Sequence, residues 1–283
     1  MGFFNRLSSG WKIGMTSFKV IRENKQLLAF PIISSIALII VSASFLGGGF
    51  LLFGQDIDSF DGSITFEQGA LLFIFYFVNY FIIIFFNMAL IHCARLYFQG
   101  EQPSVSDGIS FSQSRLSSIV GWAVFAATVG LILRAIENIH ETVGAIVSSI
   151  LGVMWGILTF FAVPVIAYEN VGPLEAIKRS GNIIKNKWGE SLGANLGINT
   201  VGFIAILIIA LPLGLLFGAL HLILGIVVGI LTAVLIGVVM SAAQTIFVAA
   251  IYHHVTEEPV AVQPFKTDLL DDVFVKRKKS KWF

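Results

Sequence analysis

The sequence predicts an all-α integral membrane protein with six transmembrane helices. Hydrophobic residues make up 56% of the 283 residues and charged residues only 12%, whereas soluble domains carry about 25% charged residues. The mean hydropathy is +0.87, and the apolar residues gather into six long runs separated by polar intervals. These runs are of the length, roughly 20 residues, that a helix needs to cross a bilayer.

The six spans are expected at residues 27–53, 70–98, 119–135, 143–168, 192–217 and 222–252. They form a single membrane domain, residues 1–258, followed by a basic tail, residues 259–283. Pro212 predicts a kink in the fifth span, because a proline inside a helix cannot donate a backbone hydrogen bond. The first apolar run follows a long basic segment and is too long for a signal peptide, so we expect it to stay as an anchor.

A polar, basic interval at residues 169–191 interrupts the apolar sequence and predicts an amphipathic helix of about four turns. Pro173 suits its first turn, and Glu175 suits the positive end of the helix dipole. Apolar residues recur on one side: Leu174, Ile177, Gly181, Ile184 and Trp188. Polar residues fall on the other side: Glu175, Lys178, Arg179, Asn182, Lys185 and Asn186. We expect the apolar side to rest on lipid or on the helix bundle while the cations meet headgroups.

Residues 2–25 form a second candidate amphipathic helix, which precedes an inward turn of the chain at Phe30 and Pro31. Its residues expected to contact lipid or a protein partner are Trp11, Lys12, Lys19 and Arg22. The tail adds a cluster of cations: Lys276, Arg277, Lys278 and Lys279. On an anionic leaflet each cation contributes about 1 kcal/mol. The alternative is that the tail only solubilises the chain and fixes its topology.

The basic residues predict the orientation of the chain. Of the 18 Lys and Arg residues, all except Arg134 fall on the side that holds both termini and residues 169–191. Lys and Arg are retained on the cytoplasmic side of membrane proteins. Both termini are therefore expected in the cytoplasm.

The cytoplasmic intervals share a weak internal repeat. Pro103, Ser110 and Arg115 match Pro173, Ser180 and Lys185 at an offset of 70, and Ser17 and Arg22 match them in the first interval. Each interval precedes two spans, which predicts three parallel units of an interfacial helix followed by a transmembrane hairpin. The alternative is a chance match, since any basic helix can place a serine five residues before a cation.

The same intervals resemble a family of uncharacterised multi-pass prokaryotic membrane proteins known only as a domain of unknown function. The resemblance is carried by Trp11 and by residues 17–22 (SFKVIR), 30–31 (FP), 94–95 (AR), 100–104 (GEQPS), 107–108 (DG), 163–165 (VPV), 175–180 (EAIKRS) and 187–190 (KWGE). It covers nearly all spans but not the tail, and it implies the cytoplasmic (inner) membrane of a prokaryote. The EAIKRS helix is also similar to one in the membrane domain attached to some bacterial glycerophosphodiester phosphodiesterases. Neither resemblance implies an activity, because the sequence contains no phosphodiesterase domain.

Small residues recur at every fourth position in the last three spans. They are Gly225, Gly229, Ala233, Gly237 and Ser241 in the sixth, Gly144, Ser148, Gly152 and Gly156 in the fourth, and Gly189, Gly193 and Gly197 at the start of the fifth. Such ladders allow helix backbones to approach closely. They predict packing within the chain or, alternatively, a homo-oligomer interface on the sixth span.

A few amides lie within the spans: Asn79, Asn87, Asn195, Asn199 and Gln244. Interhelical hydrogen bonds are the first interpretation. The alternative is a polar path for a solute, for which we name Asn79, Asn87, Asn199 and Gln244. No carboxylate lies clearly at mid-depth, which disfavours proton-coupled transport.

Nothing in the sequence indicates catalysis. There is no metalloprotease H-E-x-x-H motif, P-loop, nucleophile elbow or dinucleotide fingerprint. Glu137, His140 and Glu141 have a spacing compatible with a shared metal, but beside Arg134 they are more typical of a solvated ion-pair cluster. Cys93, the one cysteine, is expected to be a buried, inert thiol. We therefore predict no catalytic residue, cofactor or metal.

The sequence thus favours a non-enzymatic membrane protein that organises or binds lipid or a protein partner through its basic cytoplasmic face. The expected partners are membrane lipids with anionic headgroups, a second copy of the chain or another membrane protein, and not nucleic acid. The alternative is a permease or channel for a small or amphipathic solute.

Overall fold

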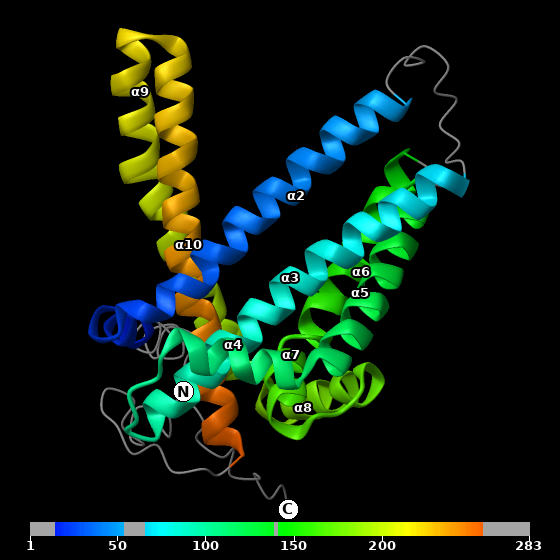
Figure 1. The fold of residues 1–283 in the computed structure, drawn as a ribbon, viewed down its shortest axis with the longest axis vertical. Coiled ribbons are helices and arrows are strands. Elements are labelled where there is room, and N and C mark those ends of the chain that lie inside the picture. The colour runs from blue at the N-terminus through cyan, green and yellow to red at the C-terminus, as the bar shows by residue number, and fades with distance from the viewer. Residues whose placement is uncertain (1–14, 54–65, 139–140, 257–283) are drawn as a thin grey trace, which may run out of the picture. The chain divides into compact units, whose positions relative to one another are not determined.

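A computed structural model describes residues 15–53, 66–138 and 141–256, and its regular elements within these ranges are all helical (Figure 1). Residues 15–23 are helical and lead into η1 (Lys25–Leu28). The later elements are α2 (Ala29–Phe53), α3 (Phe66–Phe98), α4 (Val105–Ser114), α5 (Leu116–Glu137), α6 (Glu141–Leu158), α7 (Ala162–Glu169), α8 (Pro173–Ala205), the π-helical η3 (Ile206–Ala210), α9 (Leu211–Leu220) and α10 (Leu222–Val255).

Six segments among the described residues are long and apolar enough to cross a membrane, as the sequence predicts. They are Lys25–Gly48, Phe66–Phe98, Leu116–Glu137, Val143–Glu169, Asn199–Leu220 and Leu222–His253. The fifth candidate span is described from Asn199 onward, and α8 joins the polar interval to this span without a break. The all-α, six-span fold is confirmed.

The chain forms two compact units. Among the described residues, 15–29, 93–105 and 183–256 belong to the first unit, and 30–53, 66–92, 106–138 and 141–182 belong to the second. The predicted boundary between a single membrane domain and a tail at residue 258 stays a prediction, because the tail lies outside the described residues.

In the second unit, α5 and α6 form a hairpin. Gly144 lies so close to the backbone carbonyls of Ile136 and Glu137 that a β-carbon would not fit there. Deeper in the hairpin, the rings of Trp122 and Trp155 stack with centroids 6.1 Å apart. The glycine thus allows the tight approach and the aromatic pair fills the space between the helices.

The fourth span is broken between α6 and α7. Pro164 has no N–H with which to continue the helical ladder, so the chain forms a turn at residues 159–161. The turn leaves the backbone N–H of Phe161 without a helical acceptor, and the buried hydroxyl of Ser180 accepts it at 3.0 Å. α7 then ends at Asn170, whose φ of 51° is left-handed and well tolerated by asparagine.

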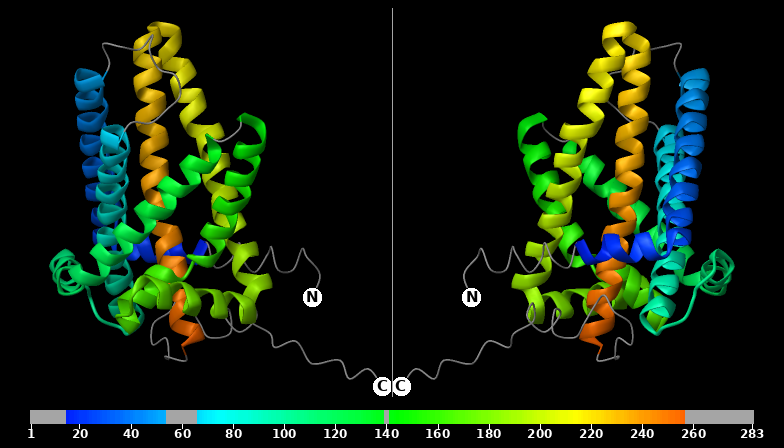
Figure 2. Two further views of the ribbon diagram at one scale, coloured as in Figure 1. Left: turned by 90° about the vertical axis from the view of Figure 1, so that its right-hand side faces the viewer. Right: turned by 90° about the vertical axis from the view of Figure 1, so that its left-hand side faces the viewer.

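In the first unit, α9 and α10 lie side by side as an antiparallel hairpin (Figures 1 and 2). Gly229 faces Gly214, and Gly225 contacts the backbone of Gly218 without room for a β-carbon. Part of the small-residue ladder of the sixth span is therefore used for packing within the chain. The π-helical η3 directly precedes α9 and Pro212, so the α-helical register is interrupted where the sequence predicts a kink.

The two halves of α10 differ in exposure. Its first half presents large apolar side chains, including Leu222, Ile230 and Leu235, which are 71%, 59% and 64% exposed. In its second half, residues 242–253 are buried with the exception of the half-buried Gln244 and Thr245. The first half is suited to lipid and the second to the protein interior.

Gly225→Ala should lower the melting temperature of the full-length protein in detergent, because the added β-carbon overlaps the backbone of Gly218. Overpacking of this kind costs about 1–3 kcal/mol. Gly237→Ala is the matched control on the same helix, since its β-carbon would meet nothing within 4 Å. Equal melting temperatures for the two variants would contradict the packing of α9 on α10.

Ser180→Ala should destabilise the full-length protein by about 1–3 kcal/mol, because it leaves the buried N–H of Phe161 without an acceptor. Chemical denaturation in detergent, followed by tryptophan fluorescence, measures the effect. Ser110→Ala changes an exposed serine of α4 and serves as the control. If both substitutions are neutral, the hydroxyl of Ser180 does not support the turn.

Candidate functional site

The beginning of α8 separates buried residues from cations. Ala176, Ser180 and Ile184, each four residues apart, are 0%, 0% and 5% exposed, whereas Lys178 and Lys185 are exposed. Residues four apart lie one above the other on a helix, so the buried residues form a single line along α8. The segment thus buries one line of side chains and exposes its lysines.

The buried line differs from the predicted apolar side, with which it shares only Ile184 among the described side chains. Leu174 is 64% exposed and Ile177 is half-buried. The small Ala176 and the hydroxyl of Ser180 occupy the inner positions because the neighbouring turn at Phe161 needs close approach and an acceptor. The side chain of Trp188 lies outside the described residues.

The three cations of this segment are not equivalent. The Nε atom of Arg179 lies 3.2 Å from a carboxylate oxygen of Glu169 and 3.4 Å from one of Glu175. These exposed pairs add little stability, but they offset the charge of Arg179. Lys178 and Lys185 have no ion pair with another described residue, so they carry the positive charge of the segment.

The N-terminal helical residues repeat this arrangement on a smaller scale. Ser17, Val20 and Ile21 are buried, whereas Lys19 and Arg22 are exposed. Lys19 lies 3.8 Å from the carboxylate of Glu23, one turn later. The predicted contact residues Trp11, Lys12, Lys276, Arg277, Lys278 and Lys279 lie outside the described residues.

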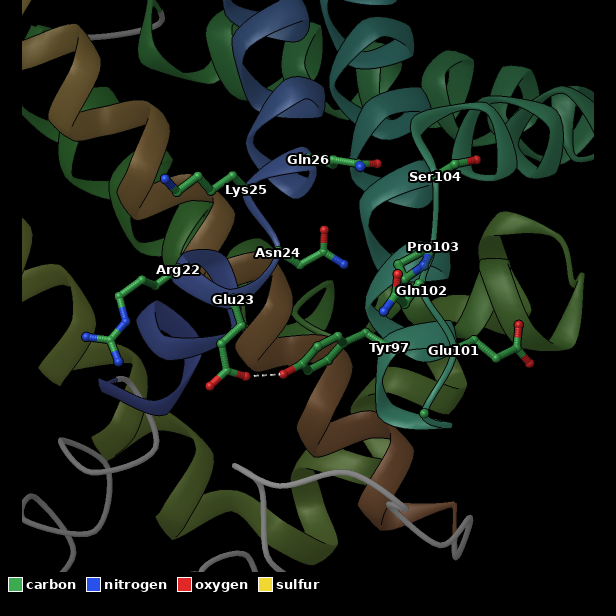
Figure 3. Close-up of a pocket in the computed structure, with 11 residues that line it drawn as sticks. Arg22, Glu23, Asn24, Lys25, Gln26, Tyr97, Glu101, Gln102, Pro103 and Ser104 are labelled. Atoms are coloured by element: carbon green, nitrogen blue, oxygen red, sulfur yellow. Dashed lines mark hydrogen bonds between the residues drawn. The ribbon is translucent and has the colours of Figure 1, made fainter.

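The first unit contains a polar pocket of about 620 Å³ where the N-terminal helical residues meet the loop after α3 (Figure 3). Two short stretches, residues 22–26 and 100–104, form its walls together with Tyr97. The hydroxyl of Tyr97 donates a hydrogen bond of 2.5 Å to the carboxylate of Glu23 and joins the walls. The buried thiol of Cys93 donates weakly to the carbonyl of Ser104, at 3.4 Å, and supports the loop.

Sequence reasoning named Arg22 as a contact residue but did not predict the pocket. Glu23 and Tyr97 are 74 residues apart in the chain, and no periodicity within either stretch indicates their meeting. The one signal in the sequence was the family resemblance, which includes residues 100–104 although they lie in a loop. Polar loop residues of this kind often serve binding.

The predicted packing residues have different surroundings. Gly144, Gly225 and Gly229 lie against neighbouring backbone, whereas a β-carbon added at Gly152, Gly156 or Gly237 would meet no atom within 4 Å. Ala233 is half-buried. The surroundings of Gly193 and Gly197, both in α8, lie outside the described residues.

The amides of the candidate polar path belong to both units, Asn79 and Asn87 to the second and Asn199 and Gln244 to the first. Asn79 donates from Nδ2 to the carbonyl of Phe75 within its own helix, at 2.7 Å. Asn87 and Gln244 are half-buried, and Asn199 is exposed. None of the four lines the pocket of Figure 3.

The residues around Arg134 form an ion pair, as expected. Its guanidinium lies 2.9 Å from the carboxylate of Glu137 at the end of α5. The described residues contain no group of three or more potential metal ligands, but His140 and the side chain of Glu141 lie outside them.

Comparison with known proteins gives one family assignment. No curated protein matches the sequence, and the comparisons give no support to the likeness with the phosphodiesterase membrane domain. A family profile described as "Family of unknown function (DUF6159)" matches residues 67–261, which include the second to sixth spans. Residues 17–22 and 30–31, which contributed to the resemblance, lie outside the match. Since the match covers more than half of the chain, the protein belongs to this family of multi-span membrane proteins.

Proposed function

We propose that the protein is a non-enzymatic component of the cytoplasmic membrane that binds anionic lipid headgroups through a basic cytoplasmic face. Lys178 and Lys185 on α8 belong to this face, and the cations of the N-terminal residues and of the tail are predicted on the same side of the membrane. Binding at this face organises lipid around the protein, and the same face is available to an acidic protein partner.

The observation that carries this proposal is the orientation of the first part of α8. Its buried line, Ala176, Ser180 and Ile184, leaves Lys178 and Lys185 exposed and without carboxylate partners among the described residues. The same helix continues into the fifth span. Lys185 lies shortly before residue 192, the predicted start of that span, and cations near the end of a span are attracted by anionic headgroups.

The buried serines support the proposed arrangement in three units. Three serines are fully buried, one in each cytoplasmic helical segment: Ser17, Ser112 and Ser180. Ser112 donates to the carbonyl of Phe85 at 2.8 Å, and Ser180 accepts from the N–H of Phe161 at 3.0 Å. Both partners belong to the span that precedes the helix.

These contacts change the register of the proposed repeat. Ser110, which the sequence pattern matched with Ser180, is exposed, whereas Ser112 is buried. The equivalent serine in α4 is therefore Ser112, two residues later. In the second and third units, a small buried hydroxyl holds the interfacial helix against the preceding span.

Lipid binding can be measured by native mass spectrometry of the full-length protein in detergent, titrated with phosphatidylglycerol or phosphatidylcholine. We expect a preference for phosphatidylglycerol that declines as salt is raised from low to high concentration, as screening requires. Lys178→Gln with Lys185→Gln should reduce the phosphatidylglycerol affinity by up to about thirty-fold, since each lysine contributes about 1 kcal/mol.

Arg134→Gln is the matched control, because it removes the cation predicted on the opposite side of the membrane. It should leave the lipid preference unchanged. A double lysine variant that binds phosphatidylglycerol as well as the wild type would refute the role of this face.

The proposed orientation has an independent test. Reporter fusions within residues 55–68 and after Phe283 should report opposite sides of the membrane, with the C-terminal fusion in the cytoplasm. The same side for both fusions would rule out both the six-span path and the three-unit arrangement.

A permease or channel is the second candidate function. The observation in its favour is the π-helical η3 followed by Pro212 in the fifth span, because such interruptions occur frequently at functional sites. Solute uptake into proteoliposomes that depends on this segment would favour transport over the binding function.

A further inference from the structure

We propose that the pocket of the first unit binds a polyol phosphate, the headgroup of a hydroxylated phospholipid. This inference rests on the proposed lipid-binding function and extends it to a second, selective site. The basic face attracts any anionic lipid, whereas the pocket distinguishes headgroups by their hydroxyl groups.

Three carboxamides are among the residues that line the pocket. Asn24 and Gln26 lie on one wall and Gln102 on the other, and Figure 3 shows the amides of Asn24 and Gln102 directed toward the same gap. A carboxamide carries two donors and an acceptor, and a hydroxyl group both donates and accepts. Amides on two facing walls therefore match a diol, whose adjacent hydroxyl groups need both kinds of partner.

The pocket also contains two cations that suit a phosphate. Arg22 and Lys25 line it, and neither has a hydrogen bond or ion pair through its side chain with another described residue. Guanidinium and ammonium groups are the usual partners of phosphate oxygens. Figure 3 shows both side chains directed away from the gap between Asn24 and Gln102, so they have to turn toward it to hold the phosphate while the amides bind the hydroxyl groups.

The acidic residues of the pocket do not favour an ammonium headgroup. The carboxylate of Glu23 already accepts the hydroxyl of Tyr97 and pairs with Lys19. Glu101 is directed away from the gap between Asn24 and Gln102 (Figure 3). A buried ammonium needs carboxylates or an aromatic cage; the one carboxylate beside the gap, that of Glu23, is already engaged, and the single ring of Tyr97 does not form a cage.

The place of the pocket along the chain favours a lipid as the source of this headgroup. Lys25 begins the first candidate span and Phe98 ends the second, so both walls lie at the ends of membrane helices. The phosphates of a bilayer lie at that level. The volume of about 620 Å³ is within the range of small-ligand sites, about 300–1,000 Å³, and it excludes a folded protein or a nucleic acid as the occupant.

The decisive comparison uses two lipids of equal charge, of which only one carries hydroxyl groups on its headgroup. Phosphatidylglycerol and phosphatidylethanol are both singly charged phosphodiesters, but only the first carries a diol. Native mass spectrometry of the full-length protein in detergent should show at least about five-fold tighter binding of phosphatidylglycerol, the effect of roughly one net hydrogen bond. Equal binding of the two lipids would overturn the proposal.

Substitutions of the glutamines that line the pocket test whether the pocket causes the preference for phosphatidylglycerol. Gln26→Leu with Gln102→Leu should abolish the preference for phosphatidylglycerol and leave phosphatidylethanol binding unchanged. Gln113→Leu, at an exposed glutamine of α4 outside the pocket, is the matched control and should keep the preference. The ratio of the two affinities is measured within one sample, so a partial loss of folded protein does not affect it. An unchanged ratio in the double variant would contradict the assignment.

Two further experiments distinguish a lipid from a soluble polyol phosphate as the ligand, and the pocket from the basic face as the binding site. Release of bound phosphatidylglycerol by glycerol 3-phosphate would show that the pocket also accepts a soluble polyol phosphate, whereas no release would restrict it to lipid. Lys178→Gln with Lys185→Gln should weaken both lipids equally and keep their ratio. If this variant no longer preferred phosphatidylglycerol over phosphatidylethanol, the assignment of the preference to the pocket would be wrong. If it bound both lipids as tightly as the wild type, only the role of the basic face would be refuted.

Discussion

Inside a bilayer every backbone N–H and C=O group needs a partner within the protein, and the rest of this structure depends on that requirement. Helices meet it along their length, and each interruption has its own compensation. At the turn between α6 and α7, the hydroxyl of Ser180 accepts the N–H of Phe161. Ahead of Pro212, the chain changes to the π-helical register of η3. The polar groups buried beside these breaks are thus parts of the backbone architecture.

The six spans could be predicted because hydropathy averages over about twenty residues and is insensitive to the neighbours of any one of them. The buried line of α8 could not be predicted in the same way. Ser180 reads as a polar surface residue, and it is buried only because a turn formed by distant residues needs an acceptor. The sequence predicted a helix within residues 169–191 and a span from residue 192, but not that both belong to one continuous helix, α8.

Charge patterns indicated the candidate surface but not its details. Sequence alone counts Arg179 with Lys178 and Lys185, whereas the structure pairs it with Glu169 and Glu175. The pocket was beyond sequence reasoning, since its two walls meet across 74 residues of chain. The glycine ladder predicted helix packing. The structure shows which glycines are used: Gly225 and Gly229 pack against α9, whereas a β-carbon at Gly237 would meet no atom within 4 Å.

The length of α10 has a consequence for how this helix crosses a membrane. The helix contains 34 residues, about 50 Å at 1.5 Å per residue, whereas a hydrocarbon core is about 30 Å thick. Its part outside the buried stretch runs from Leu222 to the exposed Ser241, about 30 Å at the same rise. That length matches the hydrocarbon core, so the buried remainder of α10, residues 242–253, is the part that extends beyond the core.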